Sequence, residues 1–170
     1  MTRIAIAGAA LALFFAASAA QAETHTLAKA GGWKAFGGTT NKGRPVCGVS
    51  HETDDSYFGL KFFSGDDTFT IQISNKDWRV KDGDKYRLVM RLDDHPDWNA
   101  TSTGMHFNDG DPGLEYDIRK QELKNFVREF NNSRRLRLRF RDGDMDNWTL
   151  DLNGVDEVKA EFDACQRKLR

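Results

Sequence analysis

Apolar residues at every second position constrain the fold of this chain more than any other feature. Successive side chains of a β-strand point to opposite faces, so this period of two predicts strands with one buried face. Turns rich in Gly and Asp separate several of these segments, which predicts antiparallel hairpins. The alternating segments predict about eight strands, at residues 33–36, 45–50, 58–62, 69–73, 86–92, 114–118, 136–140 and 148–152.

Two segments change to the helical period. In Lys120–Asn131 and in Val155–Leu169, apolar residues recur at spacings of three and four, which predicts two short amphipathic helices. Residues 23–30 are small and polar, and residues 98–107 alternate poorly, so we expect a loosely held start and an irregular segment there. The predicted fold is mainly β: an antiparallel β-sandwich or half-closed barrel of about eight strands with two short helices covering its edges.

The first 22 residues have the layout of a cleavable signal peptide. Arg3 is followed by the charge-free run Ile4–Ala17, and Ala20-Gln21-Ala22 is a small-x-small site before Glu23. The run is shorter than the roughly 20 residues that span a bilayer. We therefore expect cleavage after Ala22 and a periplasmic or secreted location for one β-rich domain, residues 23–170, with no transmembrane segment in the mature chain.

The only two cysteines, Cys47 and Cys165, lie near opposite ends of the exported part of the chain. Disulfides form and persist in exported proteins. The sequence has no C-x-x-C motif, which would indicate a redox pair, and no histidine near the cysteines, which would indicate a metal site. We predict a Cys47–Cys165 disulfide, for which chain-entropy models give roughly 4–5 kcal/mol because the closed loop is long.

Charge is nearly balanced, with 25 basic and 26 acidic residues. A nucleic-acid-binding protein normally shows a strong basic excess, so we expect no nucleic acid as partner. Any contact with a polyanion is then expected to be local.

The sharpest local feature is a row of arginines, Arg135, Arg137, Arg139 and Arg141, which alternate with Leu136, Leu138 and Phe140. On a strand these arginines share one face at a spacing of about 6.5–7 Å, and guanidinium groups bind phosphates and carboxylates in bidentate fashion. The row is thus a candidate site for lipopolysaccharide, teichoic acid or anionic host glycans. The alternative, which the sequence by itself favours, is a solvated strand face partly neutralised by Glu115, Asp117 and Asp151.

The segment Asp142–Asn147 has acidic residues at positions one, three and five, as a calcium loop does. Position six is Asn147 instead of Gly, and position twelve is Asn153 instead of a bidentate Glu, so a polar hairpin turn is favoured. No pair of histidines has the spacing of a zinc site. We predict no metal and no cofactor.

Among the four tryptophans, Trp98 lies in the irregular segment beside Pro96 and is the one we expect to be exposed, as a candidate contact for a glycan ring. Trp148 alternates with Leu150 and Leu152 and is expected in the core. No Gly-x-Ser-x-Gly motif is present. A catalytic site whose residues come together only in the folded chain remains an alternative, but we expect a non-enzymatic protein.

A sparse pattern of residues resembles the exported bacterial proteins of the invasion-associated locus B type. It comprises Trp33, the stretch from Arg44 to Gly48, Trp78, and the ending from Trp148 through Gly154 and Phe162 to Cys165. The resemblance implies a small periplasmic β-sandwich-like domain of an envelope protein linked to host interaction or envelope integrity. That family has no established catalytic residues, so none is assigned here.

Together, these features favour an exported binding protein that contacts an anionic polymer or another envelope or host protein. One alternative is a hydrolase or isomerase whose site is assembled in the fold. The other is a purely structural envelope protein. A concave pocket with a buried carboxylate or histidine would favour the enzyme, and an exposed arginine row would favour the binding protein.

Overall fold

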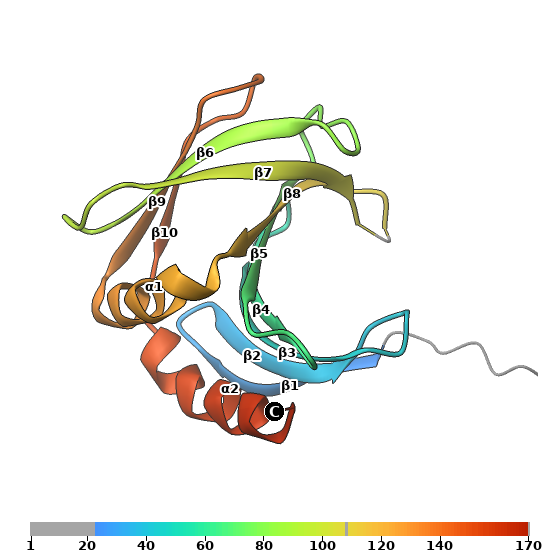
Figure 1. Ribbon diagram of the computed structural model, residues 1–170, viewed down its shortest axis with the longest axis vertical. Helices are drawn as coiled ribbons and strands as arrows, with labels where there is room; N and C mark the ends of the chain where they lie inside the picture. The colour runs from blue at the N-terminus through green and yellow to red at the C-terminus, as the bar shows by residue number, and fades with distance from the viewer. Residues whose placement is uncertain (1–22, 108, 170) are drawn as a thin grey trace, which may run out of the picture.

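The computed structural model describes residues 23–107 and 109–169, which form ten strands and two helices (Figure 1). The predicted signal peptide lies outside the described residues. The strands and helices are β1 (Glu23–Ala30), β2 (Trp33–Thr39), β3 (Pro45–Glu52), β4 (Ser56–Phe63), β5 (Phe69–Asn75), β6 (Lys85–Leu92), β7 (Trp98–His106), β8 (Pro112–Ile118), α1 (Lys120–Asn132), β9 (Arg135–Phe140), β10 (Trp148–Asp151) and α2 (Val155–Leu169).

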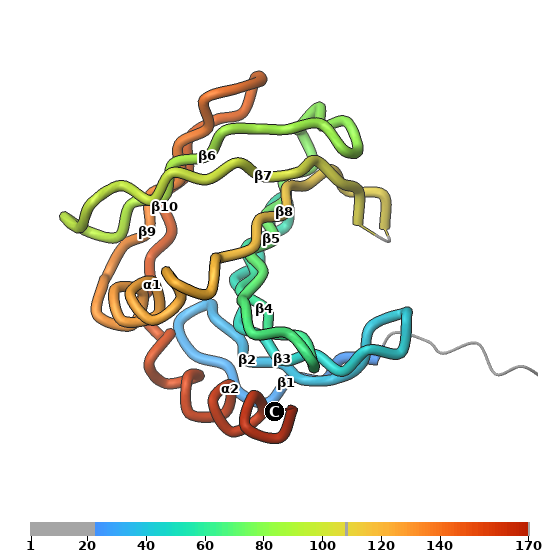
Figure 2. The backbone as a smooth tube through the Cα atoms, in the orientation of Figure 1, coloured from blue at the N-terminus to red at the C-terminus, as the bar shows by residue number. Residues whose placement is uncertain are grey.

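All ten strands belong to one antiparallel sheet, in the order β1-β2-β3-β4-β5-β8-β7-β6-β9-β10. The sheet curls strongly, as the backbone trace shows (Figure 2). The prediction of a mainly β fold with two short helices is confirmed. The architecture is one open, curled sheet, which corresponds to the half-closed barrel that we considered and not to a sandwich of two sheets.

The two faces of the sheet differ in composition. One face, which we call the covered face, carries the buried apolar side chains and packs against both helices (Figure 1). On β4, for example, Phe58, Leu60 and Phe62 point to the covered face and are buried. The other face, which we call the open face, carries polar and charged side chains. Both candidate sites described below lie on the open face.

The hairpin β4–β5 has the predicted register, with Phe58 opposite Ile73 and Leu60 opposite Ile71. Two strands were not predicted. In β7, Trp98 is followed on the covered face by Ala100, Ser102 and Gly104, which are too small to give an apolar period. Strand β1 lies at the sheet edge, where most of its side chains are exposed, so its sequence shows no buried face.

Two long-range contacts hold the ends of the chain to the sheet. Cys47 of β3 and Cys165 of α2 form the disulfide pair, with their Cα atoms 5.9 Å apart. The buried Trp33 of β2 donates a hydrogen bond from Nε1 to the Asp151 carbonyl, at 2.8 Å. Its ring also packs edge-on against Phe130 of α1. Strand β2 is therefore tied to β10 and to a helix.

Over residues 23–107 and 109–169, neither helix is long and apolar enough to cross a membrane.

Candidate functional site

Arg135, Arg137 and Arg139 lie on β9, and Arg141 follows directly after it, as the alternation predicts. Leu136 and Leu138 are fully buried on the covered face, so the arginines between them point to the open face. Arg135 and Arg141 are exposed, whereas Arg137 and Arg139 are half-buried. The row is thus a real surface feature of the fold.

Strand β6 adds two more arginines to the same face. In the antiparallel pairing of β6 with β9, Arg91 lies opposite Arg137 and Val89 lies opposite Arg139. The Arg141 amide donates a hydrogen bond to the Arg87 carbonyl, at 3.0 Å, which continues the pairing by one step. The arginine surface is defined here as Arg87, Arg91, Arg135, Arg137, Arg139 and Arg141. Sequence alone missed Arg87 and Arg91, because only the pairing of β6 with β9 brings them to the row.

Two carboxylates partly neutralise this surface. Asp97 accepts a hydrogen bond from Arg139 at 2.6 Å and lies 3.8 Å from Arg91. Asp142 forms a bidentate ion pair with Arg87. Within the described part of the chain, no ion pair forms at Arg135, Arg137 or Arg141. The six guanidinium groups therefore exceed the carboxylates bound to them.

Asp93 fixes the start of the row. Its φ of 41° lies in the left-handed region, which Asp adopts more readily than most residues. In this conformation its carboxylate accepts hydrogen bonds from the amides of Arg134 and Arg135, at 2.9 and 3.0 Å. Its carbonyl accepts a hydrogen bond from Arg137 at 3.0 Å. The side chain of Arg137 is thus held in place without being neutralised.

The residues that we expected to neutralise the row do not do so. Glu115 and Asp117 lie on β8, which β7 and β6 separate from β9, and they accept hydrogen bonds from Gln72 and Thr70, each at 2.6 Å. Asp151 lies opposite Arg135 in the register, but its carboxylate accepts hydrogen bonds from Asn153. The aspartates that do pair with the arginine surface come from the turn after β6, where Asp97 pairs with Arg139, and the loop after β9, where Asp142 pairs with Arg87.

A shallow depression of about 510 Å³ opens on this surface. Arg87 and Arg141 line it from two strands, and its base includes Val89. Asn99 and Thr101 of β7 also line it and supply hydrogen-bonding groups. Charged and neutral polar groups therefore surround one hollow, which suits an anionic group carried on a polar polymer.

The contacts of Asp142 favour a polar turn over a calcium loop at Asp142–Asn147. Hydrogen bonds from the Arg87 side chain and backbone lower the pKa of Asp142 to about 2. Its carboxylate oxygens are occupied by a cation of the protein itself, and they do not converge with Asp144 and Asp146. No group of three or more metal-ligating side chains forms in residues 23–107 and 109–169.

The expected exposure of Trp98 is wrong. Residue 98 begins β7, and its side chain points to the covered face, where it is half-buried. The indole Nε1 donates a hydrogen bond to Glu129 of α1 at 2.7 Å, and the ring packs edge-on against Phe126. The sequence favoured exposure because nothing in it shows that α1 covers this strand.

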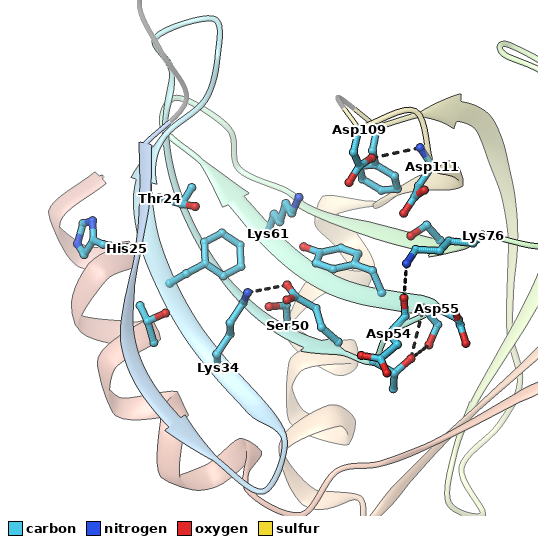
Figure 3. A pocket seen from close by; sticks show the side chains of 18 residues that line it. Thr24, His25, Lys34, Ser50, Asp54, Asp55, Lys61, Lys76, Asp109 and Asp111 are labelled. Atoms are coloured by element: carbon cyan, nitrogen blue, oxygen red, sulfur yellow. Dashed lines mark hydrogen bonds and ion pairs between the residues drawn. The ribbon is translucent and has the colours of Figure 1, made fainter.

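A second candidate site is a cleft of about 690 Å³ on the open face of β1–β5 (Figure 3). Lys61 of β4 lies at its floor and is half-buried. Its ammonium group donates a hydrogen bond to Gln72, which in turn donates one to Glu115 at 2.6 Å. Burial, opposed by the charges of Glu115 and Glu52, lowers the pKa of Lys61 to about 8.

Aromatic rings form the walls around Lys61. The ammonium lies 5.1 Å from the centre of the Tyr57 ring and 5.9 Å from that of Phe107. The Tyr57 ring lies over Gly59. A Cβ added at Gly59 would lie 2.1 Å from the Tyr57 hydroxyl, so only glycine leaves room for the ring. Burial raises the pKa of Tyr57, so this phenol stays neutral. No sequence pattern predicted this cleft, because its residues come from five strands and three loops.

Comparison with known proteins indicates what the fold resembles. No protein-family model matches the sequence, and a search of curated proteins finds no match. The chain is similar in structure to invasion associated protein B from Bartonella henselae. The TM-score is 0.55 at 14% sequence identity, over 87% of this chain and 99% of the other. At this identity the likeness shows a shared fold.

Proposed function

We propose that this protein is an exported, non-enzymatic binding protein of the bacterial envelope, and that its arginine surface binds anionic polymers such as lipopolysaccharide or anionic host glycans. The observation that carries the proposal is the excess of arginines over carboxylates on the open face of β6 and β9.

The spacing of the surface suits a chain of repeated anionic groups. Alternate residues on a strand lie about 6.5–7 Å apart, and neighbouring strands lie about 4.8 Å apart. Arg135, Arg137 and Arg141 keep guanidinium donors that no carboxylate occupies, and such forks bind phosphate, sulfate and carboxylate in bidentate fashion. A repeating anion that follows β9 meets one guanidinium group after another.

Three observations support an envelope location. The sequence begins with the layout of a signal peptide. Cys47 and Cys165 are placed as a disulfide, which is typical of exported proteins. The structural neighbour is described as an invasion associated protein of Bartonella henselae, which agrees with a role at the bacterial surface or in host contact.

The test removes the two exposed, unpaired charges of the row. The double variant Arg135→Gln/Arg141→Gln keeps Leu136 and Leu138 and breaks no ion pair. The matched control, Arg167→Gln/Lys168→Gln, removes two exposed charges from α2. Retention on heparin and on immobilised lipopolysaccharide is measured for both variants, together with the melting temperature.

We expect the row variant to bind about tenfold more weakly, because each exposed charge contact is worth up to about 1 kcal/mol. Its melting temperature should not change, and the α2 variant should bind as the wild type does. Binding should also weaken as salt rises, since the Debye length is about 8 Å at physiological ionic strength. Equal losses in the two variants would show that only net charge matters and would refute a site at the arginine surface.

A further inference from the structure

We propose that the cleft around Lys61 is a second binding site, which takes the carboxylate end of a short peptide whose other end is positively charged. The cleft lies over β1–β5, whereas the arginine surface lies over β6 and β9, which belong to another part of the sheet (Figure 1). The inference therefore goes beyond the proposed function and does not depend on it.

The floor of the cleft offers hydrogen-bond donors that the protein does not use. The ammonium group of Lys61 has three donors, and Gln72 is the one hydrogen-bond acceptor that the described residues give it. Ser50 is fully buried and lines the cleft, yet its hydroxyl has no hydrogen-bond partner among the described residues. A buried hydroxyl without a partner is unfavourable, so a ligand group that reaches Ser50 and bonds to it is favoured.

These donors suit a carboxylate better than a neutral group. At neutral pH Lys61 is mainly protonated, since its pKa is about 8. The other ammonium group near the floor, Lys34, is already paired with Glu52 at 2.6 Å. Lys61 is thus the cation left near the floor to bind an anion, and Ser50 is a neutral donor that lines the same cleft. A carboxylate can accept hydrogen bonds from the free donors of Lys61.

The mouth of the cleft has the opposite charge. Asp54 and Asp55 lie in the turn between β3 and β4, and Asp109 and Asp111 lie in the loop between β7 and β8. Figure 3 shows these two acidic pairs on either side of the opening. Lys76 is the one basic residue lining this end, and its ammonium donates to the Asp54 carbonyl instead of to a carboxylate. The mouth therefore favours a cation.

A ligand must satisfy both ends at once. A long polyanion meets the acidic mouth and is repelled, and a simple cation does not bond to the floor. A short peptide with a C-terminal carboxylate and an N-terminal lysine carries the required charges in the required order. The cleft volume of about 690 Å³ lies within the usual range for small-ligand sites, which is roughly 300–1,000 Å³.

The experiment uses the tripeptide Lys-Ala-Ala and two modified forms of it. One form has a C-terminal amide, which removes the carboxylate. The other, acetyl-Glu-Ala-Ala, keeps the carboxylate and reverses the charge at the first residue. Affinity is measured by NMR titration of the mature protein with each peptide, and the titration also reports which residues change their signals.

Three variants test the residues. Lys61→Gln and Ser50→Ala change the floor, and Asp54→Asn/Asp55→Asn changes the mouth, where neither carboxylate side chain has a bond to lose. Lys124→Gln, on an exposed position of α1, is the control. Ser50→Ala breaks no hydrogen bond among the described residues, so it keeps the test valid if Lys61→Gln unfolds the chain.

The wild type should bind Lys-Ala-Ala about tenfold more tightly than its amide, because one charge-assisted hydrogen bond is lost. Lys61→Gln should bind the acid and the amide equally, and Asp54→Asn/Asp55→Asn should lose the preference for Lys-Ala-Ala over acetyl-Glu-Ala-Ala. Signals of Ser50 and Lys61 should shift, and Lys124→Gln should behave as wild type. Absence of binding at 10 mM peptide (roughly the weakest measurable affinity), or equal binding of acid and amide by the wild type, overturns the proposal.

Discussion

Replacing Asp97 by Asn should strengthen binding of the protein to heparin. Asp97 is the carboxylate that holds Arg139 at 2.6 Å and lies 3.8 Å from Arg91, so it occupies two of the six guanidinium groups of the arginine surface. Asp97→Asn removes this charge and leaves both arginines free to bind a polyanion. The matched control is Asp94→Asn, because Asp94 is exposed, lies in the same turn and forms no ion pair with the described residues.

The expected sizes follow from exposure. The side chains of Asp97 and Arg139 are each 36% exposed, and pairs this exposed contribute about 0–1 kcal/mol to stability. The melting temperature of Asp97→Asn should therefore fall by no more than about 4 °C. A freed arginine adds a contact of similar size, so heparin affinity should rise about two- to fivefold.

The assay compares the salt concentration at which each protein elutes from heparin. Asp94→Asn measures the effect of one lost negative charge, and the additional delay of Asp97→Asn measures the freed arginines. If Asp97→Asn elutes no later than Asp94→Asn, then Asp97 does not mask a binding group and the reasoning is refuted.

Three further predictions concern the disulfide and the acidic loop. A thiol assay on the denatured, unreduced mature protein should find no free thiol, and two free thiols would contradict the pairing of Cys47 with Cys165. Cys47→Ser should lower the melting temperature by several degrees, in line with a cost of about 2–4 kcal/mol. The carboxyl group of Asp142 should titrate at about 2 by NMR, so its stabilising contribution is present above the unfolded pKa of 3.8 and is lost as the pH falls through about 2. A midpoint near 3.8, or an unchanged acid profile for Asp142→Asn, would argue against the pair with Arg87. Millimolar calcium added to EDTA-treated protein should leave the melting temperature unchanged, and a rise of more than a few degrees (roughly 1 kcal/mol of ligand-linked stabilisation) would show a calcium site.

Local sequence patterns predicted those parts of the fold in which one face of an element is apolar. The strand from Leu136 to Phe140 and both helices show such a face, and all three form where the pattern places them. Strand β7 was not predicted because three successive residues on its covered face, Ala100, Ser102 and Gly104, are small. A Cβ added at Gly104 would meet the side chains of Val80 and Tyr86, so the need for a small residue there depends on segments outside β7.

The residues of the candidate sites also differ in how far a local sequence pattern could predict them. Alternation on one strand was enough to place Arg135 and Arg141 on an exposed face. It did not reveal that Arg87 and Arg91 join them, or that Asp97 is the neutralising carboxylate, because both facts depend on the pairing of β9 with β6, more than 40 residues away. The cleft around Lys61 depends on still more strands, and for that reason no local sequence pattern indicated it.

The most direct test of the proposed function is to map a bound polyanion on the protein. A heparin hexasaccharide is titrated into mature protein labelled with ¹⁵N, and the backbone amide and arginine Nε–H signals are followed by NMR. We predict saturable shifts at the Nε–H groups of Arg135, Arg137 and Arg141 and at amides of β6 and β9, with the signals of Lys61 and Ser50 unchanged. Shifts that cluster at the Lys61 cleft, or that spread evenly over all exposed lysines and arginines, would contradict a binding site on the arginine surface.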